Sequence, residues 1–385
     1  MDFYMNGLSF FYSMKKVILF LFAIFTLGSV FAQLNGNGYY RVQNKKTLRY
    51  IRVIDNRGSV NLESTTADLA ALQTIKGFEN VVSDPSSIIY IKNAGDGYDF
   101  LAQGTSSYSI IGYYVKLYNR GATYEAYAQH AGLTKYLCDE DFDGPDGVVT
   151  TNARGDISNW YIKPVNQTDG QYFGFKPTVT VGNEYYTTIY AAFPFTLPEG
   201  MTAYYITKVD TKDNKTIAVW EEVKDGKVPA ATAVYVKCKS SDYADNKIVI
   251  GENGVSSLPG NLMKGVYFNN GSKKHNNQLA YDPNTMRVLG VGADGKLAFV
   301  TAGTDVKFIP ANTAYINVPA GSSKELELVS KTDYDMGIDD LPFEENAVLS
   351  KIYNVHGIEL EQYQPGVNIV VFEDGTVKKV LVGKE

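Results

Sequence analysis

Acidic residues alternate in one short segment, in a pattern that could bind a metal ion. In CDEDFDGPDG (residues 138–147), Asp139, Asp141 and Asp143 stand two apart and a glycine follows. Carboxylates at this spacing match the first half of an EF-hand calcium loop. The second half departs from it, because a proline follows the glycine and Thr150 stands where the last ligand would be glutamate. These aspartates are candidate calcium ligands, and a solvated acidic turn between two strands is the alternative.

Tyrosine is the unusual feature of the composition, with 29 of 385 residues. Exposed tyrosine rings pack on sugar faces or anchor a protein partner, and the alternative is that they fill the core of a small barrel. Adjacent residues of a strand point to opposite faces, so one of the neighbouring pair at 113 and 114 should point outward. The candidate ligand-binding residues are Tyr113, Tyr114, Tyr118, Tyr124 and Tyr127.

The residue types that commonly carry catalysis form no motif in this chain. The three histidines, His130, His275 and His356, are scattered, and none has a metal-ligand partner at the usual spacing. There is no G-x-S-x-G, H-E-x-x-H or P-loop pattern. We therefore expect no enzymatic activity. The only cofactor that we expect is the calcium ion of the acidic segment at 138–147. A secreted hydrolase with an unrecognised pair of carboxylates is an alternative, because the spacing that matters for such a pair is spatial.

Short runs of alternating apolar and polar residues dominate the chain and predict β-strands. Five runs rich in β-branched and aromatic residues, each bounded by turn formers, are 38–44, 87–93, 203–210, 216–223 and 232–238. One segment differs: residues 66–78 carry Leu69, Leu72 and Ile75 at helical spacing, with a glycine near the end. This spacing predicts a helix.

The N-terminal segment has the features of a secretory signal. Lys15 and Lys16 precede an apolar run, VILFLFAIF, and a short segment, TLGSVFA, follows and ends at Ala32 with the small-residue pattern of a cleavage site. The run is too short for a comfortable membrane span. We expect residues 1–32 to be a cleaved signal peptide, with residues 1–13 a misassigned start and a retained anchor as the alternative. No membrane span is expected after cleavage.

Charge and cysteine content limit the partners of the mature chain. The net charge is −6 and no basic cluster follows the N-terminal segment, which argues against a nucleic-acid partner, because binding to phosphates needs clustered Lys and Arg. Cys138 and Cys238 could form one bridge in an exported protein. Cys238 shares the alternating face of a predicted strand with Val234 and Val236, which favours a small buried thiol.

Three regions are distinguished by their internal patterns. Residues 36–177 contain loosely similar strand–turn–strand units, which suggest a threefold barrel. Residues 183–329 repeat the pattern V/I-P-A-x-T-A at Val228 and Ile309, which suggests an antiparallel sandwich of two related halves. An acidic linker at 330–346 leads to a strand-rich tail at 347–385. The expected fold class is all-β: a β-trefoil-like N-terminal domain, an antiparallel β-sandwich middle domain and a small C-terminal β tail.

The tail resembles a known family of C-terminal modules. The segments MGID, IYNVHG (352–357), PGVNIVV (365–371) and KKVLV (378–382) resemble the sorting modules of proteins exported by the type IX system of Bacteroidetes-like bacteria. The resemblance implies that the secretion machinery is a partner of the tail. It also implies delivery to the extracellular space or the outer-membrane surface of a Gram-negative bacterium.

Two further resemblances concern the other regions. The segments at 190–206, 228–236 and 308–316 resemble an uncharacterised sandwich domain of secreted proteins from the same bacteria, which implies architecture but no activity. GYYRVQN (38–44) and WYIKPV (160–165) are similar to ricin-like β-trefoil modules. Sugar-binding trefoils usually carry Q-x-W, which this chain lacks, and a shared fold does not imply a shared function.

These observations favour a non-enzymatic exported protein for binding or adhesion, with an extracellular glycan or protein as its ligand. Export features stand at both ends of the chain, and no catalytic motif stands between them. A structural cell-surface protein without a small ligand is the second hypothesis. The hydrolase with an unrecognised carboxylate pair is the third.

Overall fold

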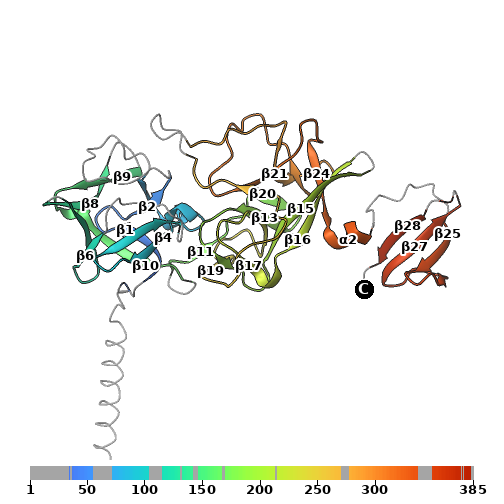
Figure 1. Cartoon of the computed structure of the whole chain (residues 1–385), viewed down its shortest axis with the longest axis horizontal. Helices are drawn as coiled ribbons and strands as arrows, with labels where there is room; N and C mark the ends of the chain where they lie inside the picture. Colours follow the sequence, from blue (N-terminus) through green and yellow to red (C-terminus); the bar gives the residue numbers. More distant parts are fainter. Residues whose placement is uncertain are drawn as a thin grey trace, which may run out of the picture.

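The computed structural model describes residues 34, 37–54, 72–103, 115–130, 132–141, 146–166, 170–212, 215–269, 277–336, 349–373, 375 and 377–382. Nearly all regular structure in these ranges is β-strand, so the predicted all-β class is confirmed (Figure 1). The predicted signal peptide at 1–32 lies outside the described residues. Within them, no helix is both long and apolar enough to cross a membrane.

The first ten strands form a barrel-like sheet that closes on itself. β1 pairs with both β2 and β10, and the ring continues through β3, β9, β8 and β7 back to β10. The trefoil assignment of this region stays a prediction. The strands are β1 Gly38–Asn44, β2 Arg49–Val53, β3 Leu72–Lys76, β4 Ile89–Asn93, β5 Tyr98–Ala102, β6 Lys116–Asn119, β7 Tyr124–His130, β8 Leu133–Asp141, β9 Asp146–Asn152 and β10 Asn159–Pro164. Short 3₁₀ turns are η2 Phe78–Asn80, η3 Pro85–Ser87 and η4 Asp156–Ser158.

Strand alternation supplies the core of this barrel. Val42, Ile51, Phe100 and Trp160 belong to one buried cluster, each from a different strand. Because side chains alternate along a strand, every second residue faces this cluster. The Trp160 indole donates a hydrogen bond to the carbonyl of Leu137 at 2.9 Å, so the largest core side chain keeps its polar group paired.

The helix expected at residues 66–78 is wrong over its described part. Residues 72–76 form β3, which lies between β2 and β9 and hydrogen-bonds to both. Leu72 is buried in the barrel core. Two long-range ladders satisfy the backbone of this segment, and this tertiary pairing overrides a weak local helical preference.

Fourteen strands build the middle region around a second core. A ten-stranded sheet contains β16 paired in parallel with β24, and a four-stranded sheet has the order β11-β19-β14-β17. The strands are β11 Phe173–Gly174, β12 Val179–Val181, β13 Glu184–Ile189, β14 Phe195–Thr196, β15 Thr202–Lys212, β16 Lys215–Glu222, β17 Lys227–Val228, β18 Val234–Cys238, β19 Lys247–Ile250, β20 Met263–Gly265, β21 Met286–Val291, β22 Leu297–Val300, β23 Ala314–Asn317 and β24 Glu325–Ser330. A short 3₁₀ turn, η5 Lys224–Gly226, precedes β17.

The two halves suggested by the sequence repeat are visible in the large sheet. In the first half, β18 lies between β13 and β15, and β16 follows; in the second, β23 lies between β20 and β21, and β22 follows. The repeated pattern forms the same turn before β18 and β23. Ala231 and Asn312, at equivalent positions, have left-handed φ values of 54° and 59°. The middle region is therefore an internal duplication in its strand order as well as in its sequence.

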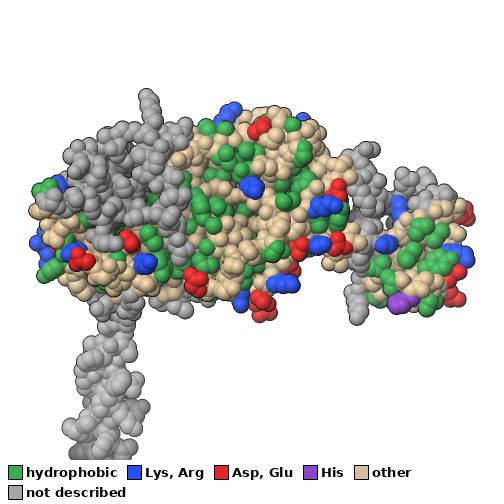
Figure 2. Space-filling view, viewed as in Figure 1, with side chains coloured by type: hydrophobic (Ala, Val, Ile, Leu, Met, Phe, Trp, Pro, Cys, Tyr) green, Lys and Arg blue, Asp and Glu red, His purple; other side chains and the backbone are tan. Residues whose placement is uncertain are grey.

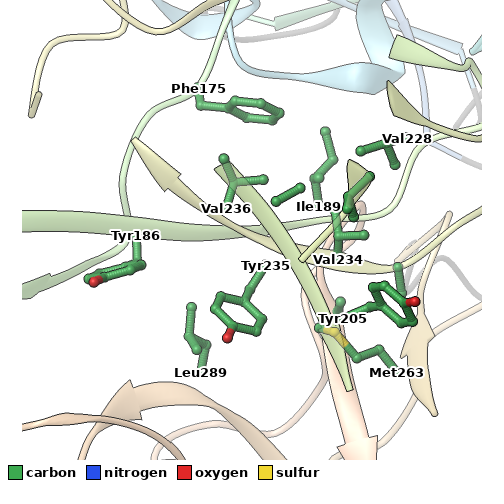
Figure 3. Close-up of a cluster of buried hydrophobic side chains, with 14 of the residues drawn as sticks. Phe175, Tyr186, Ile189, Tyr205, Val228, Val234, Tyr235, Val236, Met263 and Leu289 are labelled. Carbon is green, nitrogen blue, oxygen red and sulfur yellow. The ribbon is translucent and has the colours of Figure 1, made fainter. Parts of the chain in front are cut away.

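Strand β18 runs through the middle core, and both of its faces are buried. Figure 3 shows Val236 and Tyr235, neighbours on β18, pointing to opposite sides of the strand, toward Phe175 and Leu289 respectively. All four belong to one cluster of buried side chains that both sheets contribute to. This arrangement explains why the strand reads as an almost continuous apolar run.

The barrel and the middle region join earlier in the chain than the sequence suggested. β11 pairs with β19, and Phe173 packs in the middle core, so the boundary falls between Pro164 and Phe173 and not near residue 177. Arg41 on β1 is fully buried at this junction. Its guanidinium donates hydrogen bonds to the carbonyl oxygens of Val81, Val82, Gln171 and Tyr172 and to the hydroxyl of Ser87.

The last part of the chain forms a helix and a separate small sheet. Helix α2, Lys331–Met336, occupies the start of the predicted acidic linker, and its Tyr334 hydroxyl donates to Asp210 on β15. The tail sheet has the order β26-β25-β27-β28. Its strands are β25 Leu349–Asn354, β26 Glu359–Leu360, β27 Gly366–Phe372 and β28 Val377–Val382.

Candidate functional site

Three adjacent strands of the barrel carry the tyrosines singled out in the sequence. β6 and β8 both pair antiparallel with β7, and the register places Tyr118 opposite Glu125. Tyr127 lies opposite Lys116 on one side and Tyr136 on the other. Directly opposed residues of neighbouring strands project from the same face. We call the outward side of β6–β8, carrying these residues, the tyrosine face.

The aromatic rings of the tyrosine face are held in place and remain accessible. Tyr118 is 53% exposed, and the guanidinium carbon of Arg120 lies 4.1 Å from its ring centroid. Tyr127 and Tyr136 are half-buried, with ring centroids 5.7 Å apart and planes tilted by 41°. The cation–π contact restricts motion of the exposed Tyr118 ring, and the tilted pair restricts that of the two half-buried rings.

A buried carboxylate organises the charged groups beside these rings. Oε2 of Glu125 accepts hydrogen bonds from Nε and Nη2 of Arg120 at 2.9 and 2.7 Å, and Oε1 accepts one from Nε of Arg154 at 2.6 Å. The Glu125 side chain is 5% exposed, whereas that of Arg154 is 53% exposed. Two cations thus share one anion, and the group keeps a net positive charge. Figure 2 shows basic, acidic and hydrophobic side chains side by side at the barrel end, where Figure 1 labels β6 and β8.

The other candidate tyrosines have different positions. Tyr124 alternates with Glu125, faces inward and belongs to the barrel core, where its hydroxyl accepts a hydrogen bond from the backbone amide of Leu34. Its prediction as a ligand-binding residue is wrong for this reason. Tyr113 and Tyr114 lie outside the described residues. The structure therefore brings together Tyr118 and Tyr127 from the predicted set and adds Tyr136.

Asp139, the first predicted calcium ligand, is engaged by other protein groups. Asp139 is buried inside the barrel, where Arg49 donates from Nε to Oδ2 and from Nη2 to Oδ1, each at 3.0 Å. The hydroxyls of Thr47 and Thr74 donate to the same carboxylate. Both oxygens of Asp139 are saturated by the protein, so this residue is a core ion-pair partner and not a calcium ligand.

The other two predicted calcium ligands are Asp141 and Asp143. Asp141 is the last residue of β8, and Asp143 lies outside the described residues. In the described ranges, no three His, Cys, Asp or Glu side chains gather as a metal site would require. The segment does join two antiparallel strands, β8 and β9, as the alternative of a connecting turn expects.

Neither Cys138 nor Cys238 forms a disulfide. Cys138 lies in β8 of the barrel and Cys238 in β18 of the middle region, and both are buried. Burial raises the pKa of the Cys238 thiol to about 12. The interpretation of Cys238 as a small buried thiol is therefore confirmed.

Sequence reasoning missed the charged members of the site. Arg120 and Glu125 are five residues apart across the β6–β7 turn, and Arg154 comes from the segment after β9. The alternation Glu125-x-Tyr127 could have indicated that the carboxylate and the ring share a face. Nothing local indicated that Arg154 reaches the same carboxylate.

Comparison with known proteins adds little to this description. No family model matches the chain, and no curated protein matches it. One matching solved structure is described as "Structure and mode of action of a mosquitocidal holotoxin", with 11% identity and a TM-score of 0.26. The match covers 88% of this chain and 56% of that one, so the protein spans little more than half of the solved chain's length. A likeness at this TM-score supports no argument about function.

Proposed function

We propose that this chain is an exported, non-enzymatic binding protein whose tyrosine face takes an extracellular glycan. The observation that carries the proposal is the Tyr118 ring, which is 53% exposed and lies against the guanidinium of Arg120. A pyranose ring has an apolar face of C–H groups, and such a face packs well on an accessible aromatic ring.

The surroundings of Tyr118 lower the entropic cost of binding. Arg120 contacts the ring and is itself held by Glu125 through two hydrogen bonds. A ring fixed before the ligand arrives loses little rotamer freedom on binding. Tyr127 and Tyr136, on the same face, extend the aromatic area, and polar groups beside the rings can bond to sugar hydroxyls.

Delivery to the outside of the cell completes the proposal. The N-terminal segment would direct export and be removed, and the sheet β25–β28 would engage the secretion machinery. The support is the sequence pattern of both ends, together with a tail that forms its own four-stranded sheet. The protein would then act in the extracellular space or on the outer-membrane surface.

The test is a binding screen of the purified full-length chain against an immobilised glycan panel. Tyr118→Ala should weaken any specific binding at least about tenfold, because truncating a hot-spot aromatic costs about 2 kcal/mol or more and each 1.4 kcal/mol is about a factor of ten. Tyr363→Ala, a half-buried tyrosine of the tail, is the matched control and should bind as the wild type does. A panel without binding, or a Tyr118→Ala protein with full binding, would remove the basis for this function.

A further inference from the structure

We infer that the glycan taken by the tyrosine face is acidic, with a carboxylate on the sugar that binds to Arg154. This inference rests on the proposed function and names the ligand class. At Glu125, the guanidinium groups of Arg120 and Arg154 converge on one carboxylate. The site therefore keeps one positive charge on a protein whose net charge is −6.

Arg154 is the group with free donors. Its Nε donates to Oε1 of Glu125, and in the described part of the chain its two terminal nitrogens bond to no other group. Its side chain is 53% exposed, so these nitrogens can reach a ligand. A guanidinium presents donors in a planar fork that matches a carboxylate, and such charge-assisted bonds are stronger than bonds to neutral hydroxyls.

Glu125 cannot repel such a ligand strongly. Its carboxylate is 5% exposed and both of its oxygens accept hydrogen bonds from arginine, so its negative charge is neutralised locally. Glu125 thus acts as a positioning residue: it fixes Arg120 over the Tyr118 ring and directs Arg154 toward the same face. Removing it would free both guanidinium groups.

The ring beside this charge favours a sugar acid over an acidic peptide. Tyr118 lies directly opposite Glu125 in the β6–β7 ladder, so the stacking surface and the arginine pair are neighbours. A uronic acid joins a flat C–H face to a carboxylate in one rigid ring. An aspartate or glutamate side chain offers the carboxylate alone, without a face to stack on Tyr118.

The experiment compares an oligogalacturonate with the same oligomer after its carboxylates are reduced to primary alcohols, using the full-length chain. The wild type should bind the acidic oligomer at least about tenfold more tightly, and high salt should reduce this preference. Arg154→Gln should lose the preference while keeping its affinity for the reduced oligomer. Tyr118→Ala should weaken binding of both oligomers.

The controls separate this inference from the proposed function. Lys92→Gln removes one exposed positive charge on β4 and should behave as the wild type. Binding of neutral glycans only, or an Arg154→Gln protein that keeps the preference, would overturn the acidic ligand and leave the proposed function standing. Polyglutamate binding as tight as that of the uronate would overturn the sugar-acid assignment. Failure of every glycan to bind would overturn both.

Discussion

Arg49 and Asp139 form a bidentate ion pair inside the barrel, with both donor–acceptor distances at 3.0 Å. The two residues are ninety positions apart in the chain and come from β2 and β8. Two threonine hydroxyls complete the hydrogen bonding of the carboxylate. The pair therefore ties strands on different parts of the ring through one fully satisfied polar group.

Replacing Asp139 with alanine should destabilise the barrel by about 3–5 kcal/mol, because Arg49 would stay buried without its partner. Urea unfolding followed by tryptophan fluorescence, to which Trp160 in the same core contributes, measures this change. Asp96→Ala is the control: Asp96 pairs with Lys116 at the surface and is 89% exposed, so its loss should cost under about 0.5 kcal/mol. Equal stability of the two variants would contradict the role assigned to Asp139.

Replacing Arg41 with methionine should uncouple the barrel from the middle region. Carbonyl groups of the barrel and of the segment that leads into β11 lose charged donors, at a cost of at least about 3 kcal/mol. Calorimetry should show one transition for the wild type and two for the variant. Arg287→Met is a comparable control, since this buried arginine also donates several hydrogen bonds to carbonyl groups, but all of them lie within the middle region. A single shifted transition in both variants would argue against a coupling role.

Gly265→Ala should destabilise the middle region by about 1–3 kcal/mol through overpacking. A Cβ atom on Gly265, in β20, would overlap the ring of Tyr190. Gly155→Ala is the comparison, because a Cβ atom there meets open space. Thermal unfolding of both variants measures the difference. Indistinguishable melting temperatures would mean that Tyr190 can move aside without cost.

Ala231→Gly should stabilise the chain by about 0.5–1 kcal/mol, because alanine pays a steric penalty in the left-handed conformation. The φ of Ala231 is 54°, and the duplicated half places Asn312 at the equivalent position. Ala233→Gly makes the same chemical change at a buried position two residues later and should destabilise. Denaturant midpoints give both effects, and a loss of stability in Ala231→Gly would show that no strain is stored there.

Stability should fall at alkaline pH, in part because of Cys238. Burial raises its thiol pKa from 9.0 to about 12, so the folded state holds this proton more tightly than the unfolded state. The resulting stability is present below pH 9 and is lost as the pH rises toward 12. Burial also raises the pKa of Tyr235, which adds to the same trend. Urea midpoints between about pH 8 and about pH 10 should fall less steeply in Cys238→Ala than in the wild type. An identical slope would exclude the thiol as a contributor.

Local pattern was sufficient for the strand content and for the duplication. When apolar and polar residues alternate along a strand, one of its faces is apolar and can pack on a core, whichever strands lie beside it. This alternation predicted the all-β class. The repeat at Val228 and Ile309 marked two equivalent turns, because each turn has a residue in the left-handed conformation at the same position before a buried strand. These features depend only on residues close in sequence.

The site and its electrostatics were decided by contacts between distant residues. Alternation puts Tyr124 and Tyr127, three positions apart on β7, on opposite faces, but only the packing of the barrel decides that Tyr124 faces the core and Tyr127 faces outward. Arg49 turned a candidate calcium ligand, Asp139, into a core ion-pair partner. Arg154 reaches Glu125 because β10, the strand that follows it, pairs with β7 and places Asn159 opposite Glu125. Sequence pattern determines which faces of a strand are apolar, but pairing energies summed over the whole sheet determine the neighbours of each polar group.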